Sequence, residues 1–205
     1  MITVQADPAR GDAFYNDFYR TGGWRHSFLR EYWWHRRHVV KRFRLRRGSR
    51  LLEVGCGAGF HTDLFRRMGF DSIGVDRAAA GIAWARRHYP KCEFFHADIM
   101  SELPLMPGSF DLVLARGCSP YHYDLSGEQA RATTARLLRF LKPGGVFVMI
   151  VVTDLSGRRD PQRVWQNTLD DYRAHFSSFG LECSVDWHKG LAICGQYNLP
   201  AKASG

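Results

Sequence analysis

Residues 50–59 read RLLEVGCGAG, a short apolar run followed by three glycines at alternate positions. Glycine has no Cβ, so a loop of this composition can turn tightly and lets a ligand lie close to its backbone. Residues 58–68 have the character of a helix, and the first N–H groups of a helix have no partners within it. The stretch therefore predicts a strand, a ligand-binding glycine loop and a helix in succession.

Strand-like and helix-like segments alternate along the rest of the chain. Five strands are expected at 50–54, 71–75, 92–96, 110–115 and 146–152, with helices at 58–68, 78–88 and 128–141. The sequence KPGG at 142–145 ends the last of these helices, because proline and glycine disfavour its continuation. A further helix, 161–179, precedes strands 181–187 and 191–197, which the turn 188–190 joins into a hairpin. This order predicts an α/β fold: a seven-stranded, mostly parallel, doubly wound sheet with a C-terminal antiparallel hairpin.

The composition is that of one globular domain. The 205 residues are 45% apolar and 24% charged, which is enough to bury a full core. No apolar run approaches the roughly 20 residues of a membrane span. Residues 1–10 lack the basic start and apolar core of a secretory signal. We therefore expect a cytoplasmic protein that does not associate with a membrane.

The cysteines and histidines give no metal or disulfide pattern. Cysteines stand at positions 56, 92, 118, 183 and 194 without a CxxC pair, and the nine histidines show no HExxH spacing. An odd number of scattered cysteines argues against a disulfide framework and against a zinc site. We expect no metal.

The segment before the first strand differs in composition from the rest. Aromatic residues crowd positions 14–34, and residues 36–50, RRHVVKRFRLRRGSR, carry eight Lys or Arg and no acid. The aromatic part predicts one or two helices over the end of the sheet, which complete the core or line a lid over the ligand. The basic part is either a solvated helix face or a surface for nucleic-acid phosphates. We therefore separate an N-terminal lid or cap, 1–47, from a main domain, 48–200.

Acidic side chains end the next two strands. Sheets of this kind bind ligands beyond the carboxyl ends of their strands, and a carboxylate there can accept hydrogen bonds from ribose hydroxyls. Asp76 ends the second strand and Asp98 ends the third. The glycines follow GxGxG, with Phe60 where a dinucleotide motif has its last small residue, so a pyrophosphate would be crowded.

Together the segments LLEVGCGAG, IGVD, HADI, FDLVLARG and LKPGGVFVM resemble a class I S-adenosylmethionine-dependent methyltransferase. The resemblance covers roughly residues 50–152, and the terminal hairpin fits the family's seven-stranded, Rossmann-like sheet. It implies that residues 48–200 are a methyltransferase domain. It also implies an enzyme with S-adenosylmethionine as cofactor and S-adenosylhomocysteine as product.

The resemblance implies a role for each motif residue. Glu53 and the glycine loop would hold the methionine part of the cofactor, although Glu53 could instead cap the loop and Cys56 could simply pack. Asp76 would bind the ribose diol, and Arg77 would lie along the adenine, because a guanidinium stacks on flat rings. Asp98 would accept a hydrogen bond from the adenine amino group, with Ile99 on the other face of the ring. The implied cofactor-binding residues are Glu53, Gly55, Cys56, Gly57, Gly59, Asp76, Arg77, Asp98, Ile99 and Arg116, the last beside the cofactor's amino-acid end.

Residues 115–124, ARGCSPYHYD, are the expected reaction site. The tripeptide SPY is three residues too late for the NPPY motif of amino-group methyltransferases, and Arg116 stands where that motif has its Asn. His122 is a candidate base for a substrate hydroxyl, since its unperturbed pKa is near neutrality. Tyr121 and Tyr123 could frame the methyl-bearing cation. A structural histidine and packed tyrosines are the alternatives.

The sequence thus predicts a methyltransferase that modifies an oxygen or nitrogen atom of a small molecule. An RNA or DNA methyltransferase that uses the basic stretch is one alternative, less favoured as a partner class than a small molecule. A cofactor-binding partner protein without catalysis is another. Neither the acceptor atom nor the oligomeric state follows from the sequence.

Overall fold

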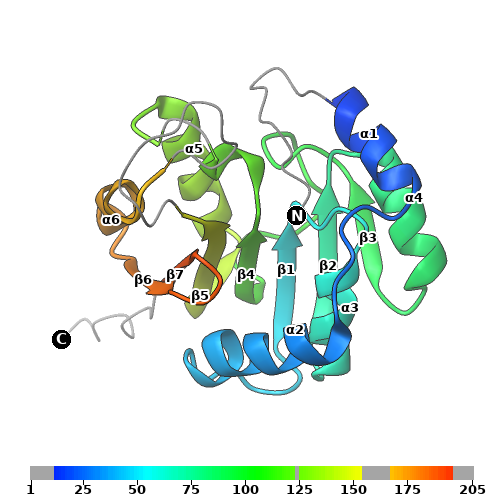
Figure 1. The fold of residues 1–205 in the computed structure, drawn as a ribbon, viewed down its shortest axis with the longest axis horizontal. Coiled ribbons are helices and arrows are strands. Elements are labelled where there is room, and N and C mark those ends of the chain that lie inside the picture. The colour runs from blue at the N-terminus through cyan, green and yellow to red at the C-terminus, as the bar shows by residue number, and fades with distance from the viewer. Residues whose placement is uncertain (1–11, 123–124, 154–166, 196–205) are drawn as a thin grey trace.

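A computed structural model describes residues 12–122, 125–153 and 167–195. They form a seven-stranded sheet with the order β3-β2-β1-β4-β5-β7-β6, in which β7 runs in the direction opposite to the other six strands (Figure 1). The strands are β1 (Arg50–Val54), β2 (Asp71–Asp76), β3 (Glu93–His96), β4 (Phe110–Arg116), β5 (Leu141–Val152), β6 (Glu182–Asp186) and β7 (Leu191–Gly195). The predicted fold class is confirmed.

Helices cover both faces of the sheet. Successive residues of a strand point to opposite faces, and in the central strands both sets are apolar. Along β4, Leu112 and Leu114 pack against α3 (Phe60–Arg67), whereas Val113 and Ala115 join the core under α5 (Glu128–Leu138) and α6 (Leu169–Ser177). The remaining sheet helix, α4 (Ala79–His88), packs on β3 and β2. Burial on both faces is what makes these strands nearly continuous apolar runs.

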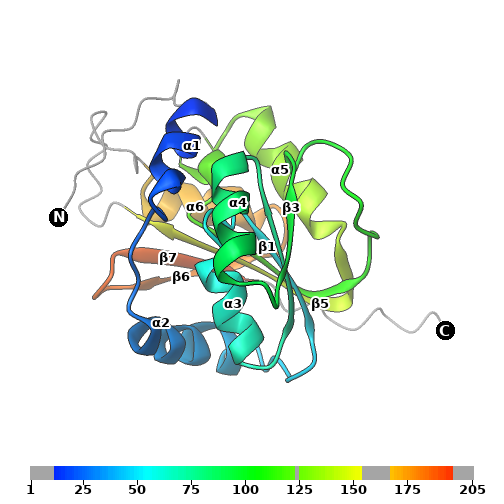
Figure 2. The ribbon, with the colours of Figure 1, turned by 90° about the vertical axis from the view of Figure 1, so that its right-hand side faces the viewer.

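The N-terminal segment folds onto the outside of these helices. Helix α1 (Asp12–Arg20) packs on α4, and helix α2 (Phe28–His35) contacts α3 before continuing as the π-helix η1 (Arg36–Lys41). Figure 2 shows the connection between α1 and α2 running down one side of the molecule. The predicted segment of one or two helices thus contains two, which pack on α4 and α3, and their connection lines the same cavity as the glycine loop.

Three boundaries differ from the expected ones by three residues or more. The helix predicted to reach residue 141 ends at Leu138, because Phe110 N donates to Phe140 O at 3.0 Å and Leu141 already pairs with β4. Strand β5 consequently includes the KPGG segment. Helix α6 begins after Thr168, whose side chain and Asp171 form a capping box. The first residues of the predicted helix 161–179 lie outside the described ranges.

One cysteine pair contradicts the expectation of no disulfide. Cys183 on β6 and Cys194 on β7 stand directly opposite each other and are joined by a disulfide. The partners are neighbours only because of the strand register, which spacing alone does not reveal. No helix in the described ranges has the length and apolar character needed to cross a bilayer. The cytoplasmic location stays a prediction.

Candidate active site

The glycine loop turns beneath the carboxyl end of β1, where the strand order reverses between β1 and β4. Gly55 and Gly57 have φ values of +71° and +53°, a region that favours glycine. Gly57 N donates to Asp76 Oδ2 at 2.7 Å, and Ala78 N donates to Asp76 Oδ1 at 2.8 Å. Asp76 therefore fixes the loop to the end of β2. A Cβ at Gly59 would meet Ala85 and a phenylalanine ring, so this glycine serves packing.

A cavity of about 120 Å³ lies on the β2–β3 side of the loop. Its lining contains four of the residues expected around an adenosine: Asp76, Arg77, Asp98 and Ile99. Asp98 Oδ1 accepts from Met100 N at 2.8 Å, and among the described residues no hydrogen bond reaches its second oxygen. We refer to this space as the adenosine-side cavity.

A larger cavity of about 270 Å³ lies on the β4–β5 side of the same loop. It is lined by Glu53, Gly55, Cys56, Gly57 and Arg116 from the expected cofactor set. Tyr19, Gly55 and Gly117 line both spaces, so the two cavities adjoin across the loop. We refer to the larger one as the acceptor-side cavity.

Glu53 lies at the inner wall of the acceptor-side cavity and is 1% exposed. Its Oε2 accepts from Thr62 Oγ1 at 2.5 Å. Burial raises the pKa of Glu53 to about 8, although the hydrogen bond from Thr62 opposes the shift. Burial also lowers the pKa of Arg116, whose Nε is buried without a hydrogen-bond partner among the described residues. An anionic ligand group at this place would satisfy that donor.

Comparison with known proteins identifies the fold's family. A model of the methyltransferase domain family matches residues 51–145. A protein of Mycolicibacterium smegmatis, described as a "Probable S-adenosylmethionine-dependent methyltransferase", is 34% identical over 137 residues, 64% of this chain and 51% of the relative. A "Ubiquinone biosynthesis O-methyltransferase" of Bradyrhizobium is 33% identical over 105 residues, 50% of this chain and 39% of that protein.

Residues 51–145 belong to a class I S-adenosylmethionine-dependent methyltransferase domain. The predicted family, enzyme class and cofactor are thereby confirmed for the domain. The chain spans about half the length, or less, of these curated relatives. Among solved structures, a Haloferax volcanii methyltransferase in complex with the Trm112 activator has a TM-score of 0.65 and 18% identity, covering 95% of this chain and 97% of its own. At that identity the likeness shows the fold alone.

The two cavities of this methyltransferase domain fit the cofactor. The carboxylates of Asp76 and Asp98 face the space where a nucleoside belongs, and Arg116 offers an unused buried donor on the other side of the loop. A Cβ at Gly57 would lie 2.5 Å from the Tyr19 hydroxyl oxygen, so only glycine lets backbone and tyrosine approach this closely. The individual cofactor contacts expected from the sequence stay predictions.

The residues expected to act on the substrate lie elsewhere. Tyr121 is fully buried in the core, where its hydroxyl lies 3.0 Å from Thr134 Oγ1. His122 is 2% exposed, lines neither cavity, and has a pKa that burial lowers to about 3. Tyr123 lies outside the described residues. The geometry thus favours the structural alternative for Tyr121 and His122, and gives neither a place in the acceptor-side cavity.

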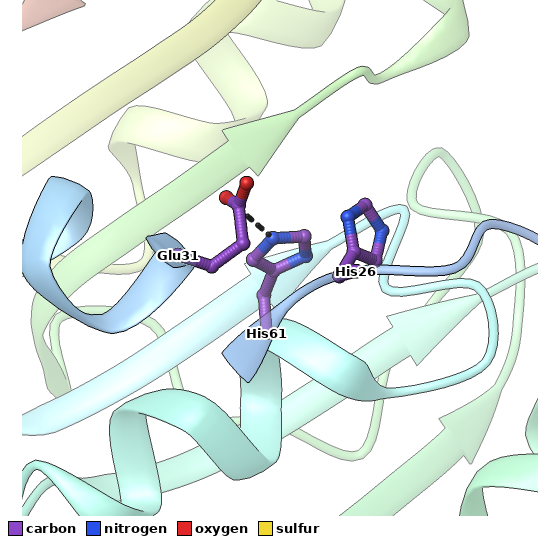
Figure 3. Close-up of side chains that lie close together, drawn as sticks. All are labelled: His26, Glu31 and His61. Atoms are coloured by element: carbon purple, nitrogen blue, oxygen red, sulfur yellow. Dashed lines mark ion pairs between the residues drawn. The ribbon is translucent and has the colours of Figure 1, made fainter. Parts of the chain in front are cut away.

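The N-terminal segment supplies residues that the motifs did not identify. Tyr15 and Tyr19 of α1 line the adenosine-side cavity, and Tyr15 Oη lies 3.0 Å from Ser119 Oγ. His26, from the connection between α1 and α2, lines the acceptor-side cavity together with His61 of α3 (Figure 3). The lid interpretation of the aromatic segment therefore fits Tyr15 and Tyr19. No local spacing signals His26, because its neighbours in space are distant in sequence.

The basic stretch 36–50 is partly tied to the domain. Arg42 Nη1 donates to Ser184 Oγ at 2.5 Å, and Arg50 Nε donates to Asp71 Oδ2 at 3.2 Å. Within the stretch, the side chains of Val39 and Phe43 are buried in the core. None of its residues is among the described residues that line the two cavities. Of the two interpretations of this stretch, the structure favours a solvated helix face over a basic surface at the edge of the site.

Proposed function

We propose that this chain transfers a methyl group from S-adenosylmethionine to an oxygen or nitrogen atom of a small molecule. The observation that carries the proposal is the acceptor-side cavity, which adjoins the adenosine-side cavity across Gly55 and is lined by two histidines. Its volume of about 270 Å³ suits a compact acceptor rather than a folded polymer.

When bound, S-adenosylmethionine supplies an electrophilic methyl carbon on a sulfonium centre. Transfer forms a bond from the acceptor atom to that carbon and breaks the carbon–sulfur bond, whose electron pair stays on the sulfur. A hydroxyl acceptor must also lose its proton, whereas a neutral amine can attack first and lose a proton afterwards. The protein's part is chiefly alignment of the two reactants, which can supply roughly 7–11 kcal/mol of the barrier.

The lining of the acceptor-side cavity suits that task. Trp24, Phe60 and Ile150 give it apolar walls that exclude water, and Arg116 and Glu53 stand at its inner end. Burial lowers the pKa of His26 to about 4, so this imidazole is neutral at pH 7 and offers a ring-nitrogen lone pair to the acceptor side of the cavity. These features favour oxygen as the acceptor atom, in keeping with the name of the Bradyrhizobium relative.

A two-stage experiment tests the proposal. Calorimetry should first show binding of S-adenosylhomocysteine and none of NAD. The chain should then be incubated with methyl-labelled S-adenosylmethionine and a panel of small phenols, alcohols, amines and, separately, RNA. Label in a phenol or alcohol, seen as a gain of one methyl group by mass spectrometry, supports the proposal. Label in RNA with none in the small molecules, or no cofactor binding, would overturn it.

A further inference from the structure

Three potential metal ligands from separate parts of the chain meet at the acceptor-side cavity (Figure 3). His26 precedes α2, Glu31 lies in the first turn of α2, and His61 lies near the start of α3. One ligand atom from each lies within 4.8 Å of the others. His26 and His61 line the cavity, whereas Glu31 is 3% exposed behind them. The arrangement places two imidazoles and a carboxylate around one point of the cavity wall.

His61 is the ring whose bonding is incomplete. Its Nε2 is buried and has no hydrogen-bond partner among the described residues, and the nearest carboxylate oxygen, Glu31 Oε2, is 3.6 Å away. Such an orphaned polar atom costs stability unless something binds it. The opposite nitrogen, Nδ1, faces Glu53 Oε1 at 3.9 Å. A carboxyl group behind a histidine is the usual outer partner of a metal-ligating imidazole, because it orients the ring.

We propose that His26, Glu31 and His61 bind one divalent transition-metal ion of the zinc or cobalt class, with its remaining position open to the acceptor-side cavity. Two imidazole nitrogens and one carboxylate oxygen are a set that Zn²⁺ and Co²⁺ accept, whereas Mg²⁺ and Ca²⁺ prefer oxygen ligands. Three protein ligands and one open position are typical of ions that act on a substrate rather than hold a fold together.

Two cations compete with the ion for the carboxylate. Arg116 Nη2 lies 3.4 Å from Glu31 Oε2, and Lys189 Nζ lies 3.2 Å from Glu31 Oε1. Their repulsion weakens binding, so the affinity should be below that of structural zinc sites. The same competition gives a distinctive signature, because removing the charge of Lys189 should strengthen binding if Glu31 is a ligand.

The consequence for catalysis rests on the proposed function. A hydroxyl oxygen of the acceptor would occupy the open position, and the ion would lower its pKa. The O–H bond then breaks with its proton released to water, which leaves an alkoxide or phenoxide as the attacking atom. Metal binding itself does not depend on this step and is tested without turnover.

The test uses the full chain without an affinity tag, stripped of metal with a chelator and titrated with Co²⁺ alone. We expect one Co²⁺ per chain, with the intense visible absorption of a four-coordinate ion. His26→Gln and His61→Gln should each weaken binding by at least about tenfold, the lower end of losses seen at metal sites. Lys189→Met should strengthen it severalfold. His88→Gln, which alters an exposed histidine on α4, should leave it unchanged.

Two results would overturn the assignment. The first is the absence of stoichiometric Co²⁺ binding, or binding that His26→Gln and His61→Gln both leave intact. The second is the absence of a gain in Lys189→Met, which would remove Glu31 from the ligand set. Because His61 is buried, circular dichroism should verify its variant, and His26 on the connecting segment provides an independent test. Binding of S-adenosylhomocysteine, measured on the same samples, separates failure of this site from failure of the proposed methyltransferase.

Discussion

The two cavities share the glycine loop but are built in opposite ways. In the adenosine-side cavity, acidic residues at strand ends are bonded by backbone N–H groups: Asp76 by Gly57 and Ala78, and Asp98 by Met100. Behind the wall of the acceptor-side cavity, the buried acid Glu31 meets cations 85 and 158 residues away along the chain. The first arrangement follows from the sheet and its loops, whereas the second exists only after the N-terminal segment has docked.

The difference has an energetic counterpart. Each carboxylate oxygen of Asp76 accepts one backbone hydrogen bond, and burial raises the pKa of Asp76 while those bonds oppose the shift. Around Glu31, burial lowers the pKa of His26, His35 and His61, because the charged form of each ring would be poorly solvated there. The first cavity therefore depends on geometry set by the strands, and the second on the charge state of its histidines. A fall in pH should therefore affect the acceptor-side cavity more than the adenosine-side cavity.

The largest expected effect is loss of stability between pH 6.5 and pH 4. The pKa of His26 is about 4 in the folded chain and 6.5 when unfolded, so in this range the unfolded chain binds more protons and folding weakens as pH falls. At roughly 1.4 kcal/mol per pKa unit, this histidine alone accounts for about 3 kcal/mol. Urea unfolding followed by tryptophan fluorescence, with a chelator present, measures the change.

A matched pair of variants isolates this contribution from that of the carboxylates. His26→Gln should reduce the difference in unfolding free energy between pH 7 and pH 4 by about 3 kcal/mol. His88→Gln, at an exposed position on α4, should retain the wild-type difference. Equal pH dependence in the wild type and His26→Gln would mean that acid does not act through the acceptor-side cavity.

The next largest effect concerns cofactor binding at the other cavity. Asp76→Ala removes the acceptor of two backbone hydrogen bonds and, on the proposed function, of the ribose hydroxyls. Affinity for S-adenosylhomocysteine should fall by about 1.5–3 kcal/mol, the scale of hydrogen bonds to a charged group. Calorimetry measures it. Asp71→Ala, at the exposed opposite end of the same strand, is the control and should bind normally. Normal binding by Asp76→Ala would remove this residue from the site.

A smaller effect tests how closely the N-terminal segment is applied to the loop. Gly57→Ala places a methyl group 2.5 Å from Tyr19 Oη at a φ of +53°, whereas Gly144→Ala has a φ of +78° and nothing within 4 Å. Both lose about 1–2 kcal/mol of stability from the left-handed backbone. Only Gly57→Ala should lose more, and that excess should shrink when Tyr19 is also replaced by Ala. Equal losses at the two glycines would mean that α1 does not rest on the loop.

The contrast between the cavities also explains what sequence reasoning could reach. The strands, the loop and the acids at 76 and 98 were predictable because apolar alternation and glycine spacing are local signals. The disulfide between Cys183 and Cys194 depends on strand register, and the cluster of His26, Glu31 and His61 depends on how α2 docks against α3. Contacts between residues so far apart along the chain leave no local sequence pattern. Residues 115–124 were predicted to form the reaction site because they follow the fourth strand. Tyr121 and His122 are instead buried and line neither cavity.

His122 should therefore give the smallest effect of all on catalysis. Its ring is 2% exposed and lines neither cavity, so a substrate in the acceptor-side cavity does not reach it. With a pKa lowered to about 3 by burial, its ring is neutral throughout the neutral pH range, so its titration cannot shape a pH–rate profile near neutrality. Once an acceptor is known, His122→Asn should keep the wild-type rate within about threefold and the same pH profile, although it loses stability.

His26→Gln, assayed alongside, should lower the rate by about 10²-fold or more if a hydroxyl is the acceptor. The reverse pattern, a large loss at His122 and none at His26, would mean that loop 115–124 rearranges to reach the acceptor, and that the histidines of the acceptor-side cavity only support its wall.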